Sequence, residues 1–139
     1  MDRSKEAAAE PYQRLTELRN GLLGLHKTLL DSESAIYDHD VARITSRGHL
    51  LGLVMDDPWF AYLHDLSRLV VEIDERLDAD EPATEAEAAR FIQQARALIT
   101  PAEQGQGFEK RYFEALQRDP NVVLAHGAMV RLLSTLREG

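Results

Sequence analysis

Apolar residues recur at alternating steps of three and four positions along two long segments of this chain. In the first segment the series is Leu15, Leu18, Leu22, Leu25, Leu29 and Ile36, with Ser32 as its one gap. In the second segment it is Trp59, Leu63, Leu66, Val70, Ile73 and Leu77. Such spacing lines up one apolar stripe along an α-helix, which has 3.6 residues per turn. The two stripes therefore predict long helices over about 11–38 and 58–78, each with one face against a core.

Prolines and capping residues predict where helices begin. Pro11, Pro58 and Pro120 each follow an acidic residue, and Thr84 forms a capping box with Glu87. Proline suits the first helical turn because its missing N–H would have no partner there, and a capping box satisfies two free N–H groups. Apolar patterns then predict further helices over 47–55, 85–99, 108–117 and 120–137. No segment has the alternation of a β-strand.

The sequence therefore predicts an all-α fold, a single-domain antiparallel helical bundle of five to six helices over residues 11–139. Residues 1–10 are expected to form a mobile tail. The segment 47–55 follows a capping serine, Ser46, and is apolar on nearly every side, so we expect a short buried helix there.

Four glycines lie inside the first two predicted helices, 11–38 and 47–55, where each costs about 1 kcal/mol relative to alanine. They are Gly21, Gly24, Gly48 and Gly52. The favoured interpretation is close packing between helices, and the alternative is a ligand pressed against the backbone.

Composition excludes several classes of function. The chain has 139 residues and no cysteine, so thiol catalysis, zinc–thiolate sites and disulfides are ruled out. Its net charge of −8 without a basic cluster argues against nucleic-acid binding. The beginning of the chain lacks the apolar region of a signal peptide, and no apolar run could span a membrane. We expect a cytoplasmic protein, and the excess of arginine over lysine is typical of bacterial sources rich in G and C.

The histidines do not form a recognisable metal or catalytic motif. No histidine has Asp or Glu three residues before it, as di-iron helical bundles require, and no two histidines are four residues apart, as in zinc proteases. Phosphate-binding loops and nucleophile motifs are also absent. The sequence thus predicts no catalytic residue, no metal site and no cofactor.

A site could still assemble between the first and third predicted helices. His26 and Glu33 are seven residues apart and flank the apolar stripe of the first helix, and His64 flanks that of the third. Trp59, the only tryptophan, could form the wall of a pocket. The simpler interpretation is that the histidines lie at the boundary of the core and that Trp59 closes one end of it.

Eight acidic residues and a single base, Arg76, lie between residues 72 and 87. The acids are Glu72, Asp74, Glu75, Asp78, Asp80, Glu81, Glu85 and Glu87. A solvated helix end and linker would have this composition. The alternative is a docking surface for a basic protein partner or a divalent cation.

The segments DPWFAYLHDLSRLVVEIDE (57–75) and LHKTLLDSE (25–33) resemble parts of small bacterial all-helical proteins of unassigned function. This resemblance implies no particular activity or ligand. From the residues themselves we expect a non-enzymatic protein that acts by association, most simply as a homodimer covering exposed apolar surface. The alternative is a bundle that binds a small ligand or metal, with His26, Glu33, Trp59 and His64 as its candidate residues.

Overall fold

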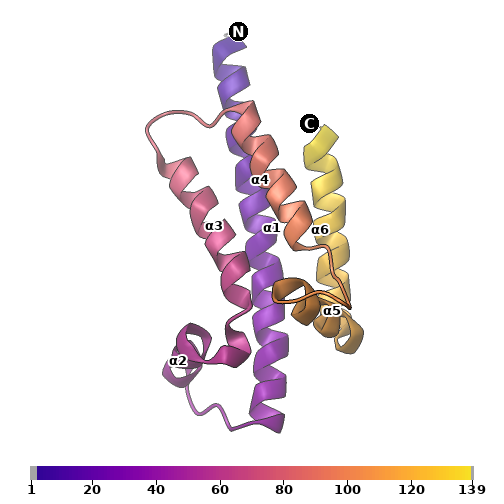
Figure 1. The fold of residues 1–139 in the computed structure, drawn as a ribbon. Coiled ribbons are helices and arrows are strands. Elements are labelled where there is room, and N and C mark those ends of the chain that lie inside the picture. The colour runs from indigo at the N-terminus through magenta and orange to yellow at the C-terminus, as the bar shows by residue number, and fades with distance from the viewer. Residues whose placement is uncertain (1–2, 139) are drawn as a thin grey trace.

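A computed structural model describes residues 3–138 of the chain. It contains six α-helices and one turn of 3₁₀-helix, and no strand occurs among these residues (Figure 1). The elements are α1 (Arg3–Asp40), α2 (Arg47–Asp56), η1 (Pro58–Phe60), α3 (Leu63–Asp78), α4 (Glu85–Leu98), α5 (Phe108–Arg118) and α6 (Pro120–Glu138). The predicted all-α bundle is confirmed.

Helix α1 is the central element of the bundle. It is 38 residues long, and α3 and α6 pack along it in the antiparallel direction, while α4 runs in the same direction as α1 (Figure 1). Helix α5 lies across the side of α1 near the beginning of α6, and α2 lies beyond the start of α3. No helix in the described part of the chain is long and apolar enough to cross a membrane.

The two apolar stripes form the core, as predicted. The five leucines of the first stripe are at most 2% exposed, and Ser32, at its gap, is also buried. On α3 the buried residues are Leu63, Leu66, Leu69, Val70 and Ile73. Burying one such aliphatic side chain contributes roughly 1.5–3 kcal/mol relative to leaving it in water. Burial of the two stripes therefore contributes much of the free energy that stabilises the packing of α3 against α1.

The boundaries of both long helices differ from the prediction. Helix α1 begins at Arg3 and not at Pro11, which lies inside the helix and is buried. The sequence Glu6 to Glu10 consists of strong helix formers, so the helix continues past a proline that removes only one hydrogen bond. The mobility expected of residues 1–10 stays a prediction.

The predicted helix 58–78 is divided into η1 and α3. Asp57 caps the first turn as expected, since the amide of Trp59 donates to its carboxylate at 2.8 Å. The next amides bond three residues back, from Phe60 to Asp57 and from Ala61 to Pro58. This tighter 3₁₀ winding turns the fully buried ring of Phe60 toward the end of α1, where it contacts Tyr37.

Helix α2 forms where predicted, but the prediction that it is buried is wrong. Ser46 caps it through the amide of His49 at 3.0 Å. Yet no residue of Arg47–Asp56 is buried, and Leu51 and Met55 are 60% and 62% exposed. The helix lies at the end of the bundle and packs mainly on η1, so only one of its sides is covered.

Of the four glycines in α1 and α2, only Gly21 permits close packing. A side chain on Gly21 would lie 2.5 Å from Leu132 and 2.9 Å from Met129, both on α6. A side chain on Gly24 or Gly52 would have no described atom within 4 Å of its Cβ outside the backbone of its own helix. A side chain on Gly48 would have only the Ser46 hydroxyl, at 3.9 Å. The packing interpretation is therefore confirmed at Gly21 and wrong at the other three.

Candidate functional site

The most unusual polar group of the protein is the carboxylate of Glu33, which is fully buried on α1. The hydroxyl of Tyr62 donates to its Oε2 at 2.5 Å, and a guanidinium nitrogen of Arg118 lies 2.8 Å from the same oxygen. A nitrogen of Arg111 lies 3.6 Å from Oε1. These four residues join α1, the turn before α3, and α5. We call them, together with Trp59, the Glu33 centre.

Arg111 fills the space between two aromatic rings of this centre. Its guanidinium carbon lies 5.2 Å from the ring centre of Trp59 and 4.7 Å from that of Tyr62. It also donates to the backbone carbonyl of Trp59 at 3.3 Å. Arginine is suited to such a position because its flat, weakly hydrated cation stacks on rings and still donates hydrogen bonds at its edge. Arg118 follows two helical turns later on α5, so both cations reach one carboxylate.

The electrostatics of the centre favour a neutral Tyr62 as the donor to the carboxylate of Glu33. Burial raises the pKa of Tyr62 above its usual value, and the negative charge of Glu33 raises it further. Tyr62 therefore keeps its proton and acts as a donor. Two guanidinium groups face one carboxylate, which leaves an excess of positive charge in a chain of net charge −8. This pairing offsets the large cost of taking Glu33 out of water.

Two buried polar atoms of the centre have no hydrogen-bond partner among the described residues. They are Oε1 of Glu33, an acceptor, and Nε1 of Trp59, a donor. Both residues contact Arg111. Unpaired buried groups are costly, at about 1–3 kcal/mol each. A polar guest such as water could satisfy each of them, by donating to Oε1 or by accepting from Nε1.

The structure places the four sequence-derived candidates in two separate groups. Glu33 and Trp59 belong to the Glu33 centre, whereas His26 and His64 are partly buried neighbours between α1 and α3. Burial lowers the pKa of His26, and the nearby His64 lowers it further. His64 uses Nε2 to contact the carbonyl of Val54 at 2.8 Å, which ties α3 to α2.

No group of three or more metal-binding side chains occurs in the described part of the chain. In the alternative interpretation His26, Glu33 and His64 would converge, whereas the carboxylate of Glu33 has arginine and tyrosine partners. Sequence reasoning missed Tyr62, Arg111 and Arg118. The only available signal was the pair of arginines seven residues apart near the inward side of α5, and it does not indicate which carboxylate they would meet.

A second buried polar pair joins α5 to α6. The hydroxyl of Tyr112 lies 2.6 Å from Nδ1 of His126. Burial raises the pKa of Tyr112 and lowers that of His126. Tyr112 is therefore the donor and the neutral imidazole is the acceptor. His126 is thus a hydrogen-bonded histidine at the edge of the core.

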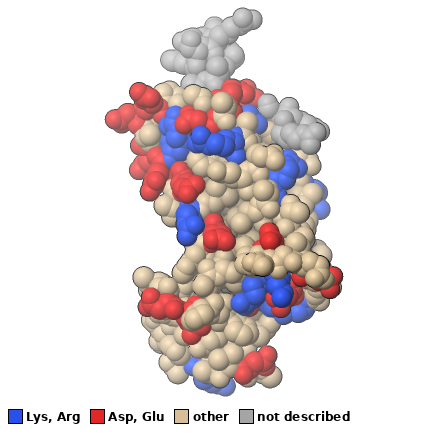
Figure 2. Space-filling model, in the orientation of Figure 1, with Lys and Arg blue, Asp and Glu red and all other residues tan. Residues whose placement is uncertain are grey.

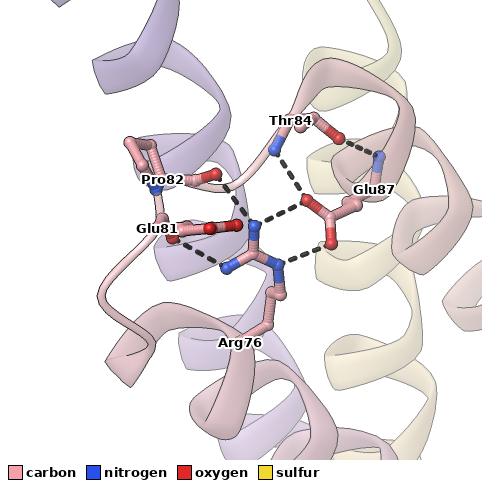
Figure 3. A network of polar contacts seen from close by, with 5 residues as sticks. All are labelled: Arg76, Glu81, Pro82, Thr84 and Glu87. Carbon is pink, nitrogen blue, oxygen red and sulfur yellow. Dashed lines mark hydrogen bonds and ion pairs between the residues drawn. The ribbon is translucent and has the colours of Figure 1, made fainter.

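The acidic segment 72–87 contains an arginine clamp, which Figure 3 shows. Arg76 on α3 donates twice to the carboxylate of Glu87 on α4, at 2.6 and 2.7 Å. Its remaining donors bond the carbonyls of Glu81 and Pro82 at 2.9 and 2.8 Å. Glu87 also completes the predicted capping box with Thr84. One arginine thereby fixes the connection between α3 and α4.

The clamp predicts a loss of stability in acid. The hydrogen bonds from Arg76 are the main cause that lowers the pKa of Glu87 to about 2 from its ordinary value of 4.5. The unfolded chain therefore binds the proton first, so the contribution of Glu87 is complete above pH 4.5 and declines toward pH 2. Urea unfolding over this range should show a smaller pH dependence in Glu87→Gln than in the wild type. Equal slopes in the two proteins would contradict the clamp.

Three of the eight acids in segment 72–87 pair within the protein. Asp74 pairs with Arg19, Glu85 with Arg14, and Glu87 with Arg76. The other five are exposed, and one of them, Glu81, accepts a hydrogen bond from Arg76 through its backbone carbonyl. Figure 2 shows acidic side chains gathered where α3 connects to α4, and basic ones at the level of α5. A basic partner at this segment would meet the remaining five acids.

Comparison with known proteins adds no assignment to this geometry. No family model, no curated protein and no solved structure matches this chain.

Proposed function

We propose that this protein acts by protein–protein association, without catalysis, and that its first partner is a second copy of itself. The supporting observation is the outer side of the α1–α6 pair. There Leu124 is 71% exposed, the largest exposed fraction among the large apolar residues that the structure describes. An exposed apolar side chain at the rim of a groove suits a surface that binds another protein.

Two hollows lie in the groove between α1 and α6, and Leu124 lines one of them. The first, of about 360 Å³, is mainly apolar, and Gly21, Gly24, Ala125, Ala128 and Leu132 contribute to its lining. The second, of about 600 Å³, is more polar, and Asp31, Asp119, Asn121 and Leu124 contribute to its lining. Ala125 borders both hollows, so they form one groove. Small residues along its floor would let another helix approach closely.

Sedimentation velocity tests this proposal directly. We expect a dimer at micromolar concentration, and we expect Leu124→Lys to weaken it because the new charge would have to leave water at the interface. Leu51→Lys is the matched control, since Leu51 is also a highly exposed leucine, on α2 and far along the chain from the groove. A wild-type monomer at about 100 μM would contradict the proposal.

Two further parts of the proposal concern location and a second partner. A cytoplasmic location is supported by the cysteine-free composition, which suits a reducing compartment. A basic protein partner is supported by the five exposed acids of segment 72–87.

A second candidate function is the binding of a small polar molecule at the Glu33 centre. The observation that favours it is the pair of unsatisfied buried atoms, Glu33 Oε1 and Trp59 Nε1. Native mass spectrometry of untagged protein would reveal such a guest as extra mass. We expect that mass to disappear in Glu33→Gln. The bare mass of the chain, alone or as a dimer, would count against this function.

A further inference from the structure

Exposed residues of α6 form one stripe on the side of the groove. They are Asn121, Leu124 and Ala128, which line the hollows, and Arg131 and Thr135, which continue the steps of three and four. The groove side of α1 has the same spacing, with Gly21, Gly24, Thr28, Asp31 and Ala35. Residues seven apart return to the same side of a helix, so both stripes run straight along the groove.

The antiparallel packing of α1 and α6 aligns these stripes in a definite register. Gly21 lies against Leu132 and Met129, and Nε of Arg14 donates to the carbonyl of Leu136 at 3.1 Å. Following this register along the helices brings Gly24 near Ala128, and Asp31 near Asn121. The apolar hollow is therefore centred on Gly24 and Ala128, and the acidic one on Asp31 and Asn121.

We infer that the second copy docks by two-fold symmetry, with the two α6 helices antiparallel in each other's grooves. The axis passes beside His126. In this register Leu124 of each copy enters the apolar hollow of the other at Gly24 and Ala128. Arg131 of each copy meets the acidic hollow of the other at Asp31 and Asn121. This inference rests on the proposed function, and it specifies the surface and the pairing.

The leucine and the arginine can reach their hollows at the same time because the spacing of the two residues matches that of the two hollows. Leu124 and Arg131 are seven residues apart on α6, about 10 Å along the axis. Gly24 and Asp31, at the centres of the two hollows, are also seven residues apart, on α1. A helix that places its leucine in the apolar hollow therefore brings its arginine to the acidic one. The two-fold axis repeats both contacts, as an isologous interface requires.

Size and charge are complementary in this arrangement. A large leucine opposes glycine and alanine, which leave room for it. Arg131 approaches the exposed carboxylate of Asp31, which here pairs with Lys27 at 2.9 Å, and the carboxylate of Asp119 lines the same hollow. Parallel packing of the two α6 helices would instead place leucine against leucine and arginine against arginine. That like-charge contact disfavours the parallel arrangement.

A charge exchange tests the pairing. Arg131→Glu should weaken the dimer at least about tenfold, because the new carboxylate would then face those of Asp31 and Asp119 in the other copy. Asp31→Arg alone should also weaken it, through two facing arginines. The double variant Asp31→Arg with Arg131→Glu should restore the dimer to within a few fold of the wild type. Both positions are exposed, so the variants should fold, which circular dichroism would verify.

Sedimentation velocity of the full chain separates the possible failures. Arg68→Glu, a reversal of equal size at an exposed position on α3, serves as the control and should leave the dimer unchanged. A dimer that is insensitive to Arg131→Glu, or that the double variant does not restore, would overturn this pairing and leave self-association standing. A wild-type chain that stays monomeric would overturn both.

Discussion

Replacing Glu33 with alanine should lower the free energy of unfolding by about 3 kcal/mol. Removing one partner of a buried ion pair costs about 3–5 kcal/mol, because the other partner is left without compensation. Here Arg111 and Arg118 keep 29% and 28% of their side chains exposed and can turn toward water, which favours the lower end of that range. Tyr62, which is nearly buried, loses its acceptor and cannot turn away so easily.

Urea unfolding followed by tryptophan fluorescence is a suitable measurement, because the only tryptophan, Trp59, belongs to the same centre. Glu17→Ala is the matched control, an exposed glutamate on the same helix, and should change stability by less than about 0.5 kcal/mol. Glu33→Gln should lie between the two, since an amide oxygen still accepts from Tyr62. If Glu33→Ala and Glu17→Ala cost the same, the centre does not stabilise the fold.

Replacing Phe60 with alanine should be at least as damaging, with an expected loss of about 3–5 kcal/mol. Its ring is fully buried in η1, and its centre lies 5.6 Å from that of Tyr37 at the end of α1. Truncation removes the ring from the core and leaves a cavity that the short 3₁₀ turn cannot easily close. In urea unfolding we expect a large fall in the urea concentration at the midpoint, with little change in the m value, the slope of unfolding free energy against urea concentration.

Leu51→Ala in the neighbouring helix α2 provides the control for Phe60. Leu51 is 60% exposed, so its truncation should cost less than about 0.5 kcal/mol. A large effect at Leu51 together with a small one at Phe60 would mean that α2, and not η1, closes this end of the core.

Local patterns were sufficient to predict the helices. The apolar stripes along α1 and α3 identify their buried faces because helix period alone determines which residues share a side. Caps at Ser46, Asp57 and Thr84 act within three residues, so the sequence contains all that they need. Proline was a weaker guide, since the helix formers before Pro11 let α1 begin at Arg3.

Burial of whole elements depended on the tertiary arrangement. Helix α2 has an apolar composition that suits a buried helix, but whether neighbours surround it depends on where the bundle ends. The glycines followed the same rule. Gly21 and Gly24 are equivalent in sequence, yet only Gly21 faces a close side chain of α6.

The amino-acid sequence by itself determined the fold class, the helices and their buried faces, and it identified Glu33 and Trp59 as residues of interest. Only the tertiary structure decided that Tyr62, Arg111 and Arg118 surround Glu33, and that Leu124 lies beside the groove of α1 and α6. The physical reason is the distance along the chain over which each kind of interaction acts. Helix period and capping act over a few residues, whereas a buried charge pairs with whichever side chains the packing of distant helices brings within about 4 Å.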